Sequence, residues 1–282
     1  MEIITESEPL FKINDIITNE AILNNYIQEL NKYNINKNKT INELIIYARH
    51  ICDGLPNEEE LFILLHSNNN INDKGLFGKI IEYSLFCQKP NCSSTADLVS
   101  LGCDIKSCAF KTLQNNDKNA KERLTITNCG NTNNYDSFKH ICDNDDFSQS
   151  KYYIKSKNFI LFVRNHDKIK FKTFDEILNQ TMLFIGCFNI ETLPLEMKNI
   201  VKDDYNKIRQ SIIEKRVSQK GQQYLHIHPH GMGHGSGTRA LGFTGKFITM
   251  IVALQIARLY NKQIEDIINK TSKSISIKKE YL

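Results

Sequence analysis

The chain has 282 residues, of which 40% are hydrophobic and 24% are charged, and its formal net charge at pH 7 is +4. A chain of this length can bury a sizeable core as one large domain or two small ones. It has no run of about 18 apolar residues, which excludes a membrane-spanning helix. Its first residues are acidic and lack the basic start and apolar run of a signal peptide, so we expect an intracellular, cytoplasmic protein.

Positive charge gathers in the last third of the chain. Residues 201–282 hold 14 lysines and arginines against 6 aspartates and glutamates, whereas residues 1–200 hold 22 against 26. Such an excess suits a surface that faces phosphate groups. The chain also has 8 cysteines, and in an intracellular protein we expect reduced thiols rather than disulfides. A zinc site built from Cys87, Cys92, Cys103 and Cys108 is a weaker alternative, because Cys103 is expected to face the core.

An N-terminal extension is predicted to precede the main domain. Residues 19–33 have the apolar spacing of a helix, and residues 34–39 form an Asn- and Lys-rich linker. We therefore place a helical extension at residues 1–39 and the main domain at residues 40–282.

Three helices are predicted next. Thr40 and Glu43 match a capping box, which begins a helix that extends to about Ile51. Acidic residues after Pro56 begin the second helix, where they meet its positive end. The third helix carries Glu82 close to an apolar face, where a carboxylate needs a cation or a bound water as partner; a surface position is the alternative. The side chains expected on that apolar face are Phe77, Ile80, Ile81 and Leu85.

The chemistry of the chain is predicted to lie in residues 97–106, which have the form D-x6-D-x-K. Side chains alternate between the two faces of a strand, so Asp104 and Lys106 point to one side and Ile105 points to the core. Asp97 lies beyond a Leu-Gly bend and can fold back beside Asp104. Two carboxylates and an ammonium then converge, which suits a divalent cation next to a phosphate. The pattern is short, and solvated loop charges are the alternative explanation.

Strands and helices alternate through the middle of the chain. We expect a polar loop over residues 115–121 and a helix over residues 203–216 that buries Tyr205, Ile208, Ile212 and Ile213. Strands are expected at residues 122–127, 158–163 and 184–188. This interleaving predicts an α/β fold, with a mixed sheet flanked by helices.

Residues 224–230 are predicted to form a strand with His226 and His228 on one face. A Gly-rich loop over residues 231–245 and a long helix from Lys246 follow. Alternate histidines are compatible with a metal site, but no nearby carboxylate completes a ligand set, and a polar strand that faces DNA explains them equally well. The glycine loop lacks the Lys-Ser/Thr end of a P-loop, so we exclude nucleotide binding.

Taken in order, these segments resemble the MutH family of DNA endonucleases, which includes GATC-cutting type II restriction enzymes. The matching motifs are Thr40-Ile41-Asn42-Glu43-Leu44, Asp73-Lys74-Gly75-x-x-Gly78-x-x-x-Glu82, Asp97-x6-Asp104-Ile105-Lys106, Glu122 after a polar loop, Lys155 before an apolar strand, Tyr224-Leu225-x-Ile227-x-Pro229, and Gly242-Phe243 with Phe247. They span roughly residues 40–260, and the ordered set is more specific than any one motif. The resemblance implies a PD-(D/E)xK restriction-endonuclease-like fold, with a catalytic part at about residues 73–165 and a DNA-recognition part at about residues 200–260.

The resemblance further implies a Mg²⁺-dependent enzyme, with Mn²⁺ as a substitute, that cuts double-stranded DNA and leaves 5′-phosphates. Asp97 and Asp104 would hold the metal, and Glu82 would bind a second metal or a metal-bound water. Lys106 would orient or deprotonate the attacking water. Lys155 would support the phosphate or the water.

The resemblance also indicates where DNA is contacted. The expected contacts are Lys74, Tyr224, His226, His228, Arg239, Phe243 and Lys246. Arg239 is the best candidate for reading a base edge. The expected partners are double-stranded DNA, a second copy of the chain on that DNA and, in function, a cognate DNA methyltransferase.

Two positions depart from the family. Asp104 stands where the family has glutamate, which shortens the carboxylate by one methylene and shifts the expected position of the metal. His228 replaces an arginine of the DNA-contacting strand, so the recognised sequence, GATC or a related site, stays open. We expect a type II restriction enzyme. The alternatives are a MutH-type nicking enzyme of mismatch repair and a non-catalytic DNA-binding protein on the same fold.

Overall fold

The computed structural model describes residues 8–35, 38–67, 75–89, 95–166, 171, 173–217, 220–230, 236–271 and 274–282. The chain divides into two compact units. Unit 1 comprises Met1–Ser107 and Leu161–Cys187, and unit 2 comprises Cys108–Ile160 and Phe188–Leu282.

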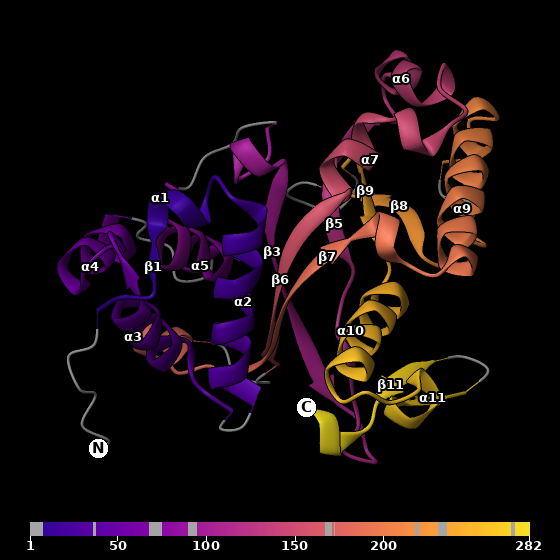
Figure 1. Cartoon of the computed structure of the whole chain (residues 1–282). Coiled ribbons are helices and arrows are strands. Elements are labelled where there is room, and N and C mark those ends of the chain that lie inside the picture. Colours follow the sequence, from indigo (N-terminus) through magenta and orange to yellow (C-terminus); the bar gives the residue numbers. More distant parts are fainter. Residues whose placement is uncertain are drawn as a thin grey trace. The chain divides into compact units, whose positions relative to one another are not determined.

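Helices and strands alternate along the described residues (Figure 1). The α-helices are α1 (Ile13–Ile16), α2 (Glu20–Ile35), α3 (Ile41–Ile51), α4 (Glu58–Ser67), α5 (Leu76–Phe86), α6 (Lys139–Cys142), α7 (Lys151–Ser156), α8 (Phe174–Leu178), α9 (Leu195–Ile213), α10 (Gly245–Leu259) and α11 (Ile264–Ile267). The strands are β1 (Phe11–Lys12), β2 (Cys52–Asp53), β3 (Cys103–Thr112), β4 (Lys118–Ala120), β5 (Leu124–Asn131), β6 (Asn158–Asn165), β7 (Met182–Asn189), β8 (Leu225–Pro229), β9 (Thr238–Phe243), β10 (Ile268–Lys270) and β11 (Ile275–Ile277).

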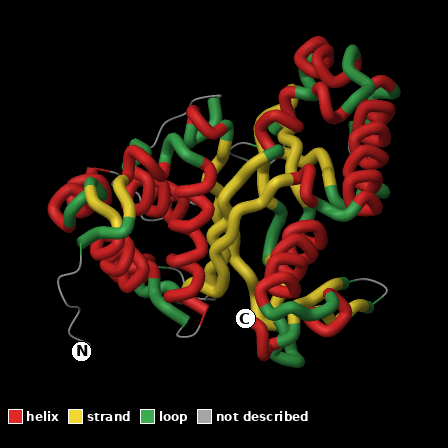
Figure 2. Tube along the Cα trace, viewed as in Figure 1, coloured by secondary structure: helices red, strands yellow, loops and turns green. Residues whose placement is uncertain are grey.

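Within the described residues the strands form three sheets. A six-stranded sheet has the order β10-β11-β4-β3-β6-β7, a three-stranded sheet has the order β5-β9-β8, and β1 pairs with β2. Figure 2 shows these strands in yellow and the helices in red. The predicted α/β class, with a mixed sheet flanked by helices, is confirmed. Among the helices of the described residues, none combines the length and the apolar character that crossing a bilayer requires.

Unit 1 is held together by the apolar faces of α2, α3 and α5. The predicted capping box is present, because Thr40 Oγ1 accepts from the N–H of Glu43 and Glu43 Oε2 accepts from the N–H of Thr40. The hydroxyl of Tyr26 in α2 donates to the carbonyl of Leu85 in α5 at 3.3 Å. All the residues predicted to face inward on α5 are buried: Phe77, Ile80, Ile81 and Leu85. These contacts fix α5, and with it the place of Glu82.

In unit 2, the β5-β9-β8 sheet shares a core with α10. Leu225, Leu241 and Phe243 are buried, and the ring of Phe243 stacks on that of Phe247 with centroids 4.4 Å apart. The helix is capped at its start, where Thr244 Oγ1 accepts from the N–H of Phe247 at 3.2 Å. The long helix predicted after the glycine loop is therefore confirmed.

Two loops predicted in this unit contain strands. Residues 118–120 of the predicted polar loop form β4, which is too short for an alternating pattern to reveal it. Residues 238–243 of the predicted glycine loop form β9, which lies between β5 and β8. A Cβ at Gly242 would lie 2.7 Å from the carbonyl oxygen of Leu124 and 2.9 Å from Cε1 of His228, so this central strand needs glycine there.

The helix predicted over residues 203–216 also differs from the structure. α9 begins at Leu195, directly after Pro194, and ends at Ile213. Tyr205, Ile208 and Ile212 are buried as predicted, but Ile213 is 47% exposed. Ile213 is the last residue of the helix, where the buried face ends.

Candidate functional site

A tight turn before β3 returns Asp97 to the strand. The 3-10 turn η1 (Val99–Leu101) ends at Gly102, whose φ of 55° lies in the left-handed region that glycine adopts without strain. Asp97 Oδ2 then accepts a hydrogen bond from the N–H of Ile105 at 2.8 Å. The spacing therefore predicts correctly that Asp97 folds back toward Asp104.

Asp104 and Lys106 lie on one face of β3 and are in contact. Lys106 Nζ lies 2.7 Å from Asp104 Oδ2, and Asp104 is only 2% exposed. Ile105, between them, is buried on the other face. Removing a carboxylate from water is costly unless it is paired, so this ion pair compensates for the burial of Asp104.

Glu82 of α5 joins this cluster. Burial raises the pKa of its carboxyl to about 7, helped by the charge of Asp97 and, less strongly, of Asp104. Gly78 lies one turn earlier, and a Cβ there would be 3.6 Å from both Glu82 Oε1 and Ser107 Oγ. Glu82 therefore faces β3 next to Ser107.

The donor set of the cluster fits a hard divalent cation. Lys106 and Lys79 oppose the rise in the pKa of Glu82, but burial and the charges of Asp97 and Asp104 together outweigh them. No group of three or more His, Cys, Asp or Glu side chains in the described part of the chain is arranged to hold a metal ion. Mg²⁺ is often bound through only one or two carboxylates, together with waters and substrate phosphates. A site based on Asp97 and Asp104 is therefore compatible with that finding.

The structure does not place three other residues of the predicted catalytic part in this cluster. Lys155 is half-buried in the short helix α7 of unit 2, whereas the cluster consists of residues of unit 1. Lys74 lies outside the described residues. Glu122 is exposed, two residues before β5 begins.

In unit 2, β8 carries its histidines on one face, above the small residues of β9. His226 lies opposite Gly242 and His228 lies opposite Ala240, and residues directly opposite share a face. The two imidazole rings have centroids 4.9 Å apart. His228 Nε2 lies 3.2 Å from Thr125 Oγ1 of β5.

Both histidines are neutral at neutral pH. Burial lowers the pKa of His226 to about 4 and that of His228 to about 3, and the charge of Arg123 acts in the same direction. His226 Nε2 and His228 Nδ1 are enclosed and have no hydrogen-bond partner in the part of the chain that the structure describes. These two nitrogens can contact DNA only if the groups that cover them move. Arg123 is itself exposed, so it is the accessible cation beside this face.

Arg239 lies on the opposite face of the sheet from the histidines. It pairs with Pro229 across the ladder, and alternation along β9 puts it with Leu241 rather than with Gly242. Its Nη1 donates to the backbone carbonyls of Ser236 at 2.7 Å and Thr238 at 3.1 Å. Arg239 is therefore held by its own strand and does not join His226 and His228.

The aromatic residues predicted to contact DNA are buried. Phe243 is 1% exposed in the core beside α10, so we exclude it as a DNA contact. Tyr224 is also buried, with Lys246 Nζ 5.8 Å from its ring centroid. Lys246 itself is exposed. Of Phe243, Tyr224 and Lys246, a phosphate can therefore reach Lys246.

Three residues near these sites were not predicted: Ser107, Arg123 and Asp204. Nothing in the spacing around Ser107 or Arg123 identifies them. The burial of Asp204 could have been predicted, because it precedes Ile208 by four residues and so lies on the buried face of α9. A buried aspartate on a helix needs donors from another element, and the structure supplies them.

Comparison of the sequence with models of known protein families gives no match, and comparison with curated proteins also gives none. The function must therefore be argued from the two groups of residues described above. One is the carboxylate cluster of unit 1, and the other is the histidine face of unit 2.

Proposed function

We propose that this protein is a Mg²⁺-dependent endonuclease that hydrolyses phosphodiester bonds in double-stranded DNA. The observation that carries the proposal is the cluster of unit 1, in which Asp104 Oδ2 lies 2.7 Å from Lys106 Nζ and the charges of Asp97 and Asp104 act on Glu82. Carboxylates beside an ammonium provide what metal-assisted phosphoryl transfer needs. The proposed fold is of the PD-(D/E)xK type, as in the MutH family that the motifs resemble.

The four residues of the cluster have separate proposed roles. Asp97 and Asp104 would hold the cation, which when bound supplies a Lewis acid for the scissile phosphate and lowers the pKa of a bound water. Lys106 would orient that water or neutralise charge that develops on the phosphate oxygens. Glu82, which burial and the charges of Asp97 and Asp104 act on, would bind a second metal or a metal-bound water. The expected support of the phosphate or the water by Lys155 stays a prediction.

The proposed DNA-contacting surface lies in unit 2. Arg123 and Lys246 are exposed cations, and cations at a protein surface bind the phosphate backbone of DNA. We propose that they approach the phosphates, and that His226 and His228 reach the base edges once the groups that cover their ring nitrogens have moved. His228 stands where the family has arginine, so we favour a type II restriction enzyme for GATC or a related site over a repair enzyme.

The direct test is cleavage of supercoiled plasmid DNA with Mg²⁺. The wild-type protein should give linear DNA with 5′-phosphate ends, and EDTA should abolish cutting. Asp97→Asn and Lys106→Ala should each slow cutting by about 10²- to 10³-fold. Lys111→Ala is the matched control, because Lys111 is an exposed lysine on the same strand, and it should cut at the wild-type rate.

The products separate the remaining alternatives. Nicked circles without linear DNA would indicate a MutH-type nicking enzyme. DNA binding without any metal-dependent cutting would indicate a non-catalytic protein. Equal rates for the wild type, Asp97→Asn and Lys106→Ala would show that the catalytic residues lie elsewhere. Sequencing the ends of the cut DNA gives the recognised site.

A further inference from the structure

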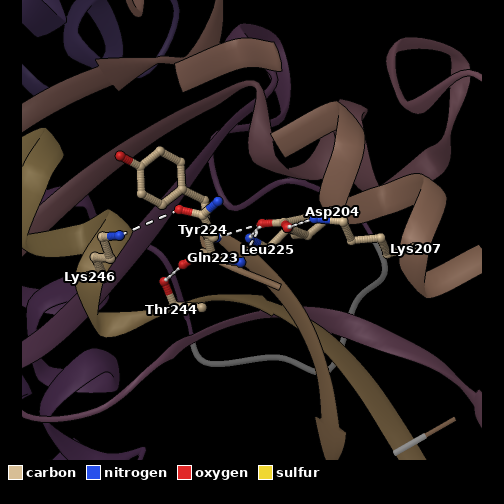
Figure 3. A network of polar contacts seen from close by, with 7 residues as sticks. All are labelled: Asp204, Lys207, Gln223, Tyr224, Leu225, Thr244 and Lys246. Carbon is tan, nitrogen blue, oxygen red and sulfur yellow. Dashed lines mark hydrogen bonds and ion pairs between the residues drawn. The ribbon is translucent and has the colours of Figure 1, made fainter. Parts of the chain in front are cut away.

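A buried carboxylate in unit 2 receives three backbone hydrogen bonds (Figure 3). Asp204 Oδ2 accepts from the N–H of Gln223 at 2.9 Å, of Tyr224 at 2.6 Å and of Leu225 at 3.0 Å. Asp204 belongs to α9 and is 0% exposed, whereas the three donors lead into β8. These N–H groups replace the water that the carboxylate loses on burial.

The carbonyl groups of the same segment are held by the start of α10. Thr244 Oγ1 donates to the carbonyl of Gln223 at 2.7 Å, and the N–H of Thr244 donates to the carbonyl of Tyr224 at 2.8 Å. Lys246 Nζ makes a longer contact, 3.5 Å, with Gln223 Oε1. Asp204 and Thr244 therefore fix the first residues of β8 through their N–H groups and carbonyls together, as Figure 3 shows.

This arrangement sets which way the side chains of β8 face. β8 is an edge strand of its sheet, and an edge strand has N–H groups that no neighbouring strand pairs. A register shift of one residue would exchange the face of the histidines with that of Leu225 and Ile227. By binding the N–H of Leu225, Asp204 holds the strand in the register that keeps His226 and His228 on their shared face.

The three hydrogen bonds depend on one oxygen atom. Asp204 Oδ1 has no hydrogen-bond partner within the described residues, and its nearest cation, Lys207 Nζ, lies 3.9 Å away. An asparagine can therefore present its single carbonyl oxygen to the same three donors, as a weaker acceptor. Asp203, the preceding residue, is exposed, which makes it a matched control for the loss of an aspartate from α9.

We infer that Asp204 is a positioning residue that fixes β8, and through it the surface with which unit 2 contacts DNA. The inference rests on the proposed function, because it assigns Asp204 to DNA binding and not to the chemistry. It predicts that loss of Asp204 weakens DNA binding and reduces its sequence specificity, while the rate of the hydrolytic step stays the same.

The test measures two properties of the full-length protein. Hydrogen exchange followed by mass spectrometry reports on the peptide that holds Tyr224 and Leu225. Exchange there should be about ten-fold or more faster in Asp204→Ala, about two- to five-fold faster in Asp204→Asn, and unchanged in Asp203→Asn. In plasmid cleavage, Asp204→Ala should raise KM about ten-fold, keep kcat within about two-fold, and widen the range of sequenced ends.

Each outcome decides a different point. Unchanged exchange in folded Asp204→Asn or Asp204→Ala overturns the positioning role, whatever the protein does to DNA; Asp204→Asn serves if the alanine variant does not fold. If hydrogen exchange is faster but the KM and the sequenced ends are unchanged, Asp204 holds β8 without affecting DNA recognition. If the wild type neither binds nor cuts DNA, the proposed function fails and the DNA part of the inference fails with it. The exchange measurement then still shows whether Asp204 holds β8.

Discussion

The two units surround their buried acidic groups in different ways. In unit 1, Glu82 lies among other carboxylates, and burial together with the charge of Asp97 raises its pKa to about 7. In unit 2, burial also raises the pKa of Asp204, but three backbone N–H groups act in the opposite direction. Like charges held together call for a cation from outside, whereas a carboxylate bound to backbone donors connects two elements of the fold. We propose the first arrangement as a ligand site, whereas the second holds two elements of the fold together.

Removing the lysine from the cluster of unit 1 should have the largest effect on stability. Lys106→Met leaves the buried carboxylate of Asp104 without its ion-pair partner. Breaking a buried pair in this way costs about 3 kcal/mol. Urea unfolding in EDTA should show this loss, and added Mg²⁺ should restore part of it, because the cation takes the place of the ammonium. Lys111→Met should change the free energy of unfolding by no more than about 0.5 kcal/mol. A loss that Mg²⁺ does not relieve would mean that the pair is only structural.

The pH dependence of unit 1 should carry a contribution from Glu82 of about 2 kcal/mol, reduced from the full shift because the side chain is only half-buried. Its pKa rises from 4.5 to about 7 on folding, so between these values the native state binds more protons than the unfolded state. The free energy of unfolding therefore falls as pH rises through this range. In metal-free protein, Glu82→Gln should abolish the decrease in the free energy of unfolding between pH 5 and 8. An unchanged pH profile would show that burial does not raise the pKa of Glu82 in the folded protein.

The histidine face of unit 2 should show an effect of similar size with the opposite sign. The pKa of His226 falls from 6.5 to about 4 on folding, so its contribution to stability is present above pH 6.5 and is lost as pH falls through about 4. His226→Gln should reduce the acid-side loss by about 2 kcal/mol. His230→Gln is the control, because His230 is exposed on the same strand end. If His226→Gln and His230→Gln show the same dependence of unfolding free energy on pH, burial of His226 does not contribute to stability.

The predictions that succeeded depend on neighbours in the chain. Thr40 with Glu43 marks the start of α3 within four residues, and the alternation of Asp104, Ile105 and Lys106 sets their faces within three. The apolar spacing of α5 also placed Glu82 beside a buried face. In each case the residues that determine the structure are neighbours in the sequence, so the local pattern is enough to predict it.

The predictions that failed depend on partners far away in the sequence. β9 was expected to be part of a glycine-rich loop, yet Gly242 is needed there because His228 and Leu124 approach it from two other strands. The face on which Arg239 lies is set by its pairing with Pro229, which its own segment does not reveal. The donors to Asp204 lie 19 to 21 residues along the chain. No local spacing contains such information, so sequence reasoning can find a buried aspartate but not its partners.

We propose above all that the cluster of Glu82, Asp97, Asp104 and Lys106 is a metal-dependent phosphodiesterase centre. This proposal is tested by the rate at which metal-stripped wild-type protein cuts plasmid DNA as Mg²⁺ is added back. We expect no cutting without the cation, cutting that rises and saturates with Mg²⁺, and linear products with 5′-phosphate ends. Cutting that continues undiminished in EDTA, or none at any Mg²⁺ or Mn²⁺ concentration, would contradict it.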